Sequence, residues 1–368
     1  MKICHVINDL SRGGAESHLY SLAKIQLEKG QEVSLLLLGR DLNNFASLEE
    51  QFNNLAIKIL RLGGPKKLQG INPFSIFQGI RYFRNNNFDI IHTHSPRSDF
   101  LVYLSNLFVH SKSKRIVTIH GKYGTYLQGN YFIDSLRKIF IRQQSKIWQN
   151  ANKVIVISES IKEWLFELNS SIKPIVINYG VEIPQFNIRR DLNNPTIGFL
   201  GKLNKNKGVE DLIKIYNEID KEEESPITNL NLLIGGVGSE EYTKKIKNQV
   251  KSDNVKFLGY VVDRSKFFES IDLFLFPSYS EGLGLVLLEA MSYGILCITR
   301  DVSPMNNIII NNENGLLFKD NKELKDIIQF SINMSTSERE RMIKSAYKTI
   351  ENSYSIIQMY LSTEKAYS

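Results

Sequence analysis

Short apolar runs alternate with longer amphipathic segments along the whole chain. The first run, at 2–8 (KICHVIN), is followed by a polar loop, an amphipathic segment through about Lys29, and a second run at 32–38 (EVSLLLL). Apolar positions at helical spacing between two strand-like runs predict a β-α-β unit, with Gly30 as the helix stop. Comparable runs follow at 88–94, 115–121, 153–158 and 174–180. We therefore expect a parallel sheet wrapped by helices in the first half.

The same alternation starts again after a polar stretch that contains Pro184 and Pro195. Its strand-like runs lie at 196–203, 229–236, 255–260, 272–278, 295–300 and 315–318. The pattern predicts two doubly wound α/β domains, 1–180 and 195–350, joined by a linker at 181–194. Residues 351–368 are predicted to form a terminal helix that could pack back on the N-terminal domain. A chain of 368 residues is also longer than one hydrophobic core usually supports.

Composition and the distribution of cysteines narrow the class of protein. A hydrophobic content of 42% is that of a folded globular chain. Cys4 and Cys297 lie far apart in apolar runs, so neither a disulfide framework nor a zinc site is expected. The start MKICHVI is too short for a signal peptide, and nowhere do 18 apolar residues follow one another. These observations favour a cytoplasmic protein.

The charge is unevenly distributed between the two halves. Residues 1–180 hold 23 Lys and Arg against 13 Asp and Glu, whereas residues 181–368 hold 23 against 26. A basic first half is compatible with nucleic acid, an anionic membrane surface or a phosphorylated substrate, and charge alone does not choose among them.

The segment EGLGLVLLEA at 281–290 places two carboxylates around an apolar, glycine-containing run. Glu281 follows the strand-like run 272–278, and the carboxyl ends of parallel strands are where open α/β sheets bind ligands. Gly282 and Gly284 allow tight turns. A helix from about Leu285 would offer free N–H groups to an anion such as a diphosphate, and Glu289 would lean back toward the same place. The ordinary alternative is a solvent-exposed Glu281 that caps the helix and a Glu289 that pairs with a lysine.

A second phosphate element follows the strand-like run at 196–203. Lys202 and Lys207 lie in the loop GKLNKNKG between Gly201 and Gly208. Two cations on a strand-to-helix loop suit a leaving diphosphate, whose charge grows in the transition state. Lysines on loops are usually only solvated, so this signal gains weight from sharing a domain with the glutamate motif.

Three motifs in this order carry a resemblance to a known family. GGAE at 13–16, GKLNKNKG at 201–208 and EGLGLVLLEAMSYG at 281–294 resemble the retaining GT-B glycosyltransferases that build bacterial polysaccharides, lipopolysaccharides and glycolipids. The resemblance covers nearly the whole chain. It implies two Rossmann-like domains facing across a cleft, with a nucleotide sugar, expected to be a UDP-sugar, bound by the second domain and a glycan or lipid-linked acceptor bound by the first.

The resemblance also implies roles for individual residues. Glu281 would contact hydroxyls of the donor sugar, Glu289 the ribose, and Lys202 with Lys207 the diphosphate. The donor site would further include residues 282–285, namely Gly282, Leu283, Gly284 and Leu285, and the turn at Gly13 and Gly14.

Two histidines at strand ends complete the expected site. His120 in TIHG matches the histidine that such enzymes place near the anomeric centre, and His94 in IIHTHSP would lie on the acceptor side. Without the family, a strand-end histidine is more often structural than catalytic. His92 points the other way on its strand and is predicted to be structural.

The chain departs from the family pattern in two places. Lys202 stands where an arginine is usual, so the bidentate fork is lost. Ser303, Pro304 and Asn307 stand where relatives often have two glycines and a glutamate. This difference leaves open whether the donor is positioned as in the relatives and whether the enzyme is fully active. No Asp-x-Asp pair occurs in the chain, so we expect an enzyme without a metal or other cofactor.

A basic amphipathic segment lies at 131–148. Apolar positions at helical spacing accompany a stripe of Lys138, Arg142 and Lys146, and residues 110–146 carry eight Lys and Arg against one Asp. Such a helix can lie on an anionic leaflet, although an ordinary surface helix fits equally well. Peripheral attachment to the inner face of the cytoplasmic membrane is therefore a hypothesis.

Three other classes of protein remain for comparison. A dinucleotide-dependent dehydrogenase would need a G-x-G-x-x-G turn, which SRGGAES lacks. A nucleic-acid binder is not expected, because no stacking platform or known module is visible. A nucleotide-sugar-binding protein with impaired catalysis stays open as the alternative to the enzyme.

Overall fold

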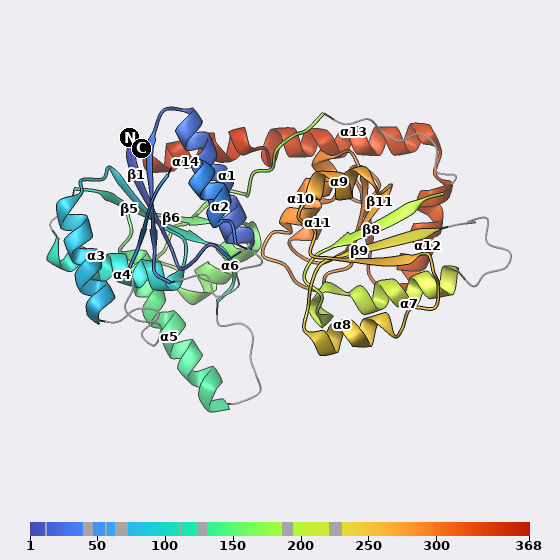
Figure 1. Ribbon diagram of the computed structural model, residues 1–368, viewed down its shortest axis with the longest axis horizontal. Coiled ribbons are helices and arrows are strands. Elements are labelled where there is room, and N and C mark those ends of the chain that lie inside the picture. The colour runs from blue at the N-terminus through green and yellow to red at the C-terminus, as the bar shows by residue number, and fades with distance from the viewer. Residues whose placement is uncertain are drawn as a thin grey trace. The chain divides into compact units, whose positions relative to one another are not determined.

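The computed structural model of the protein describes residues 1–11, 13–39, 47–55, 57–62, 73–109, 112–123, 131–185, 194–220 and 230–368, with the side chains of 131–138 outside the description. The chain forms two compact units. Unit 1 contains residues 1–180 and 356–368, and unit 2 contains residues 181–355 (Figure 1). No helix in these described residues is long and apolar enough to cross a membrane.

Unit 1 is a parallel sheet of seven strands in the order β3-β2-β1-β4-β5-β6-β7. The strands are β1 (Lys2–Ile7), β2 (Glu32–Leu37), β3 (Lys58–Arg61), β4 (Ile90–Thr93), β5 (Lys114–Ile119), β6 (Lys153–Val156) and β7 (Ile175–Val176). The helices are α1 (Gly14–Glu28), α2 (Glu49–Asn54), α3 (Pro73–Asn85), α4 (Pro96–Phe108), α5 (Tyr131–Gln149), α6 (Glu159–Leu168) and α14 (Ile356–Tyr367). The order reverses between β1 and β4, so residues after these two strands meet at one place on the sheet edge.

Unit 2 is a parallel sheet of six strands in the order β10-β9-β8-β11-β12-β13. The strands are β8 (Thr196–Leu200), β9 (Asn231–Gly235), β10 (Val255–Gly259), β11 (Leu273–Phe276), β12 (Leu296–Arg300) and β13 (Leu316–Phe318). The helices are the 3-10 helix η1 (Lys205–Lys207), α7 (Val209–Ile219), α8 (Glu240–Lys247), α9 (Arg264–Glu269), α10 (Leu285–Ser292), α11 (Met305–Ile308), α12 (Asn321–Asn333) and α13 (Thr336–Ser353). Here the order reverses between β8 and β11, which are the strands that precede the lysine loop and the glutamate motif.

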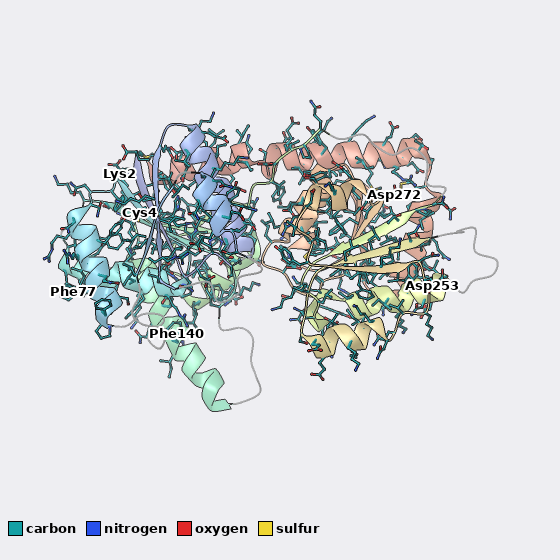
Figure 2. All side chains as sticks on the ribbon, viewed as in Figure 1. Lys2, Cys4, Phe77, Phe140, Asp253 and Asp272 are labelled. Atoms are coloured by element: carbon teal, nitrogen blue, oxygen red, sulfur yellow. The ribbon has the colours of Figure 1, made fainter. Side chains whose placement is uncertain are left out.

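The cores follow the apolar runs, because strands covered on both faces need apolar side chains on both. In unit 2, β8, β9, β11 and β12 bury Ile197, Leu232, Leu273 and Leu296 together with the inner face of α7. In unit 1, Cys4 of β1 is buried beside Leu36 of β2, well inside the sheet layer (Figure 2). Both cysteines are free.

The structure differs from the expected elements in two places. Strand β3 was not predicted, because its four residues KILR are partly exposed and lack a long apolar run. The predicted terminal helix at 351–368 is two elements, since α13 ends at Ser353 within unit 2 and α14 begins at Ile356. Helix α14 packs against α1 in unit 1. Residues 186–193 of the predicted linker lie outside the described residues.

Candidate donor site and histidine network

Two loops of unit 2 are held together at the carboxyl edge of the sheet. Gly208, after the lysine loop, has φ of 68°, and a Cβ there would lie 2.3 Å from the carbonyl oxygen of Pro277. The backbone N–H of Tyr279 donates a hydrogen bond of 2.8 Å to the carbonyl of Asn206. Only glycine permits this approach, because any side chain would collide with the neighbouring backbone. The loop after β8 therefore rests directly on the loop after β11.

This contact brings Lys207 and Glu281 together. The Lys207 ammonium lies 2.5 Å from a carboxylate oxygen of Glu281, and the two side chains are 22% and 11% exposed. Lys207 also lies over the ring of Phe276, 6.0 Å from its centroid. Lys202 is exposed and makes no ion pair within the described residues. Of the two lysines expected at the diphosphate, the structure thus joins only Lys207 to the glutamate motif.

The glycines of the motif differ in their backbone conformations. Gly284 is the residue before α10 and has φ of 88°, whereas Gly282 is not in the left-handed region. A Cβ at Gly284 would lie 3.3 Å from the Phe276 ring. Leu283 is buried and anchors the turn. The backbone N–H groups of Leu287 and Leu288 donate to the carbonyl of Gly284, so the N–H groups left without an acceptor within α10 are those of Leu285 and Val286.

Glu289 lies one turn into α10 and has a partner that the sequence did not indicate. One guanidinium nitrogen of Arg264 donates to both carboxylate oxygens, at 2.5 and 2.6 Å. Burial raises the pKa of Glu289, and the Arg264 charge opposes that rise. Both glutamates of the motif are therefore compensated by cations of unit 2.

Arg300, at the end of β12, was also missed. Its guanidinium donates to Asp211 at 2.9 Å and to the carbonyl oxygens of Pro277 and Lys319 at 3.2 Å each. It lies between aromatic rings, 4.1 Å from the centroid of Tyr279 and 4.9 Å from that of Phe318. The feature of the sequence that could have indicated Arg300 is a cation at the end of the apolar run ILCITR. Arg300 supports the loop that carries Glu281.

The residues that depart from the family pattern follow Arg300. Ser303 and Pro304 lie between β12 and α11, and Asn307 lies within α11. They are thus at the same carboxyl edge of the unit 2 sheet. The next strand along that edge, β11, carries the glutamate motif.

Unit 1 contains a buried chain of hydrogen bonds among histidines. His120 contacts the hydroxyl of Tyr179 at 2.8 Å through Nδ1 and His94 at 3.2 Å through Nε2. His94 contacts His5 at 3.0 Å, and His5 contacts the Gln26 carbonyl at 2.8 Å. Because the Gln26 carbonyl accepts, each imidazole can donate through Nε2–H and accept through Nδ1. The hydrogen bonds then all run in one direction, from the Tyr179 hydroxyl to Gln26.

The series of hydrogen bonds continues from Gln26 to α14. The Gln26 amide donates to the hydroxyl of Tyr367 at 3.3 Å, and this hydroxyl lies 2.7 Å from Nδ1 of His92. His92 Nε2 lies 2.7 Å from Thr118 Oγ1. His92 therefore has structural surroundings, as expected, but it does not point the other way, because its ring centroid lies 4.3 Å from that of His94. The contact with Tyr367 also ties α14 to the sheet.

Burial keeps these histidines neutral at pH 7. It lowers the pKa of His5 to about 4 and that of His120 to about 3. The pKa values of His18, His92 and His94 are also held well below the usual range, by burial first and by neighbouring histidines second. His120 is therefore a neutral imidazole with both nitrogens engaged.

His94 is buried within the histidine network. Its side chain is 2% exposed, and both ring nitrogens bond to other histidines, so it supports His120, and its place on the acceptor side stays a prediction. The turn before α1 does reach this network. A Cβ at Gly14 would lie 3.5 Å from the Tyr179 ring, and Gly13 is the N-cap of α1. His18 of α1 stacks on Tyr179 with centroids 4.7 Å apart.

Three of these histidines lie close enough to hold a metal ion. His5, His92 and His94 each offer a ring nitrogen within 4.8 Å of the others. All six of their nitrogens already take part in hydrogen bonds with Gln26, Tyr367, Thr118 or another histidine. The cluster is therefore a satisfied hydrogen-bonded network that a metal could enter only by breaking these contacts.

Comparison with solved structures identifies the fold. The chain superimposes over 99% of its length on 99% of the Anabaena Alr3699/HepE structure in complex with UDP, with a TM-score of 0.81 and 16% identity. A glycosyltransferase from Rickettsia africae gives a TM-score of 0.78 at 20% identity, covering 100% of this chain and 97% of that one. Two parallel-sheet α/β units of this kind define the GT-B fold.

Sequence comparison then gives the family. Residues 12–183 match the model described as Glycosyltransferase Family 4, and residues 182–349 match the model described as Glycosyl transferases group 1. Together they extend across both units, and the chain belongs to the group 1 glycosyltransferases.

Curated relatives are more distant. The O-antigen biosynthesis glycosyltransferase WclY of Escherichia coli is 29% identical over 229 residues, which are 58% of this chain and 62% of that protein. The chain thus spans about three fifths of the length of that relative. The capsular polysaccharide biosynthesis glycosyltransferase CapM of Staphylococcus aureus is 25% identical and covers 80% of each chain.

Proposed function

We propose that this protein transfers a sugar, with retention of configuration, from a nucleotide sugar to a glycan or lipid-linked acceptor in the assembly of a surface polysaccharide or lipopolysaccharide. A UDP-sugar is the expected donor, because structures of the same fold contain UDP or UDP-glucose. The curated relatives named for O-antigen and capsule biosynthesis favour a bacterial glycan as the product.

The observation that carries the proposal is the ion pair between Lys207 and Glu281 at the start of α10. It places a cation, a carboxylate and the free N–H groups of a helix at one sheet edge, where strands β8 and β11 meet. The N–H groups and Lys207 would hold the diphosphate and stabilise the charge that develops as it leaves. Glu281 would orient hydroxyls of the sugar. These groups supply positive charge without a metal ion.

Hydrolysis of the donor in the absence of acceptor tests the proposal. Purified protein is incubated with a panel of nucleotide sugars, and release of the nucleoside diphosphate is measured for wild type, Glu281→Ala and Lys207→Ala. Turnover of one donor that is lost in both variants supports the enzyme and identifies its sugar. Binding of a donor with no turnover, even with crude lipid and glycan acceptors, favours the alternative of a catalytically impaired nucleotide-sugar-binding protein.

An exposed surface of unit 1 supports the hypothesis of attachment to an anionic membrane. Exposed apolar side chains follow three neighbouring helices, Phe74 and Phe77 on α3, Phe100, Leu107 and Phe108 on α4, and Ile139 and Phe140 on α5. Figure 2 shows Phe77 and Phe140 at the periphery of unit 1. The exposed cations of the same helices are Arg81, Arg84, Arg97, Arg142 and Lys146.

The structure adds residues of α3 and α4 to the basic helix α5 that the sequence alone indicated. The described side chains of α3, α4 and α5 include one carboxylate, that of Asp99, and it is buried. The predicted residues 131–138, with Lys138, lie outside the described side chains. Cations around exposed aromatic rings suit an anionic headgroup layer.

Vesicle binding tests the membrane surface directly. We expect the protein to co-sediment with vesicles containing phosphatidylglycerol at low salt and not with vesicles of phosphatidylcholine alone. Phe77→Ser should weaken this binding, whereas the matched change Phe330→Ser on unit 2 should leave it unchanged. Equal binding by both variants, or none by wild type, would remove the hypothesis of membrane attachment.

A further inference from the structure

Arg300, the last residue of β12, connects three segments of unit 2. Its side chain is buried, and Nε donates to the backbone carbonyl of Pro277, just after β11, at 3.2 Å. Nη1 donates to the carbonyl of Lys319, just after β13, at 3.2 Å. Nη2 donates at 2.9 Å to the carboxylate of Asp211 in the first turn of α7. Because each guanidinium nitrogen binds a different segment, one side chain joins all three.

The surroundings of Arg300 hold its guanidinium in one orientation. The rings of Tyr279 and Phe318 lie 4.1 and 4.9 Å from its central carbon. Asp211 accepts in addition from the Tyr279 hydroxyl at 2.5 Å and from the side-chain amide of Asn321 at 3.2 Å. The side chains of the ion pair are 7% and 19% exposed. Loss of one member of such a pair leaves the other charge buried without compensation.

The segment 277–281, which Arg300 contacts, leads directly to Glu281. The carbonyl of Pro277 accepts from Arg300 and also faces Gly208 of the lysine loop, where a Cβ would lie 2.3 Å from it. The N–H of Tyr279 donates to the same loop, and its ring packs on the guanidinium. Arg300 therefore holds the segment that presents Glu281 against the lysine loop.

Asp211 extends the same network to Lys207. Lys207 ends the 3-10 helix η1, and α7 begins at Val209 with Asp211 in its first turn. The contact between Asp211 and Arg300 thus ties the helix that follows Lys207 to the segment that precedes Glu281. The 2.5 Å separation of the Lys207 ammonium and the Glu281 carboxylate depends on this connection.

We propose that Arg300 is a positioning residue of the donor site. By joining the first turn of α7 to the segment 277–281, it keeps Lys207 and Glu281 at the separation needed to hold the diphosphate and the sugar of one donor molecule. Arg300 acts through these two residues, because its own nitrogens are engaged with backbone carbonyls and Asp211. The inference rests on the proposed function, because it adds a residue to that same site.

The test is a double-mutant cycle on the affinity for UDP, measured by titration calorimetry. Arg300→Met should weaken UDP binding roughly tenfold, because the displaced Lys207 loses a charge-assisted contact with the diphosphate. In a Lys207→Met background the same change should cause no further loss beyond about twofold, since the contact it acts on is already absent. Arg300→Lys should bind with intermediate affinity, because an ammonium group cannot reach three segments at once.

A second variant separates position from charge. Arg300→Met leaves the Asp211 carboxylate without its cation, which destabilises the fold and adds negative charge near the diphosphate. The double variant Arg300→Met with Asp211→Asn removes both charges of the pair and avoids this cost. It should still bind UDP roughly tenfold more weakly than wild type, because the connection between α7 and the segment 277–281 remains broken.

The matched control is Arg339→Met. Arg339 is also buried, and it donates to two backbone carbonyls at the end of α12. Burial lowers the pKa of Arg339, and the charge of Asp272, the residue before β11, opposes this. Arg339 therefore lies near the amino edge of the sheet, opposite the edge that carries Glu281. Its replacement should lower the melting temperature as Arg300→Met does, while UDP affinity stays within about twofold of wild type.

Three results would overturn the inference. Wild-type UDP affinity in Arg300→Met would mean that Arg300 only stabilises the fold. A tenfold loss that persists in the Lys207→Met background would mean that Arg300 does not act through Lys207, and an equal loss in Arg339→Met would assign the effect to general destabilisation. If UDP, GDP and ADP all fail to bind wild type, the proposed function is rejected, and this inference with it.

Discussion

The buried histidines predict that unit 1 loses stability steeply as the pH falls from 7 to 5. Burial lowers the pKa of each histidine in the folded unit, while an unfolded histidine titrates near 6.5. The unfolded chain therefore binds more protons below pH 6.5, and the stability present above that pH is lost as the pH falls toward the folded pKa values. Each histidine that stays neutral when folded costs about 1.9 kcal/mol between pH 7 and pH 5.

Two carboxyl groups of unit 1, Asp99 and Glu364, act in the opposite direction, because burial raises the pKa of each. Burial raises the pKa of Asp99 to about 7, with hydrogen bonds that include that of Trp148 opposing the rise. Between pH 7 and pH 5, folded Asp99 therefore gains a proton that the unfolded group does not. This uptake raises the free energy of unfolding by about 2 kcal/mol. Five neutral histidines, His5, His18, His92, His94 and His120, would lose about 9 kcal/mol together. The balance is a loss of several kcal/mol, a large part of the stability of a domain.

Urea unfolding followed by tryptophan fluorescence measures this effect in unit 1 alone. The chain has two tryptophans, Trp148 and Trp164, and both belong to unit 1. We expect the free energy of unfolding to fall by several kcal/mol from pH 7 to pH 5. A change of less than about 2 kcal/mol would refute the reasoning, because it would mean that folded histidines take up protons as readily as unfolded ones.

Replacing one histidine tests how many histidines take up a proton only on unfolding. His18 Nδ1 is buried without a hydrogen-bond partner among the described residues. His18→Phe should therefore keep the ring contact with Tyr179 and reduce the loss between pH 7 and pH 5 by about 1.9 kcal/mol, the contribution of one histidine. An unchanged pH dependence in this variant would show that His18 is not one of the neutral groups.

Three further predictions concern unit 2. Gly208→Ala should lower the free energy of unfolding by at least about 2 kcal/mol more than Gly30→Ala in thermal melts, because both positions have positive φ but only Gly208 faces backbone within 2.3 Å. Equal costs would contradict this. Lys207→Met should reduce kcat for the donor about 10²–10³-fold, and Lys207→Arg less, in assays of nucleotide release; a fall in affinity alone would mean that Lys207 does not act on the leaving group. Activity should survive EDTA, and a strict need for Mn²⁺ or Mg²⁺ would contradict metal independence.

The meeting of the lysine loop and the glutamate motif at one sheet edge was predictable because each follows a strand directly, whereas their role as a donor site stays a prediction. Lys207 and Glu281 lie 74 positions apart, and the rule that ligands gather at the carboxyl ends of strands was enough to expect them at one edge. Their direct pairing needed the close approach of Gly208 to Pro277. Arg264 could not be predicted, because the packing of α9 against Tyr293 is invisible in the local sequence of either segment.

The histidines show the opposite case. A strand-end histidine was expected at 120, and the neutral state of its ring depends on Tyr179, His94 and the buried elements around them. The place of His94 on the acceptor side was expected from the resemblance to the family, which does not show that both of its ring nitrogens bond to other histidines. Those partners come from neighbouring strands of the sheet.

The sequence by itself determined the two doubly wound units, nearly all of their strands, and the residue types gathered at the unit 2 sheet edge, because hydrophobic period and strand-to-helix turns are local properties. Tertiary structure alone decided which charges pair, which histidines are buried, and that Tyr367 at the end of the chain completes a network begun at His5. Those outcomes depend on contacts between segments far apart in the sequence, and such contacts set burial and hydrogen bonding, which in turn set protonation.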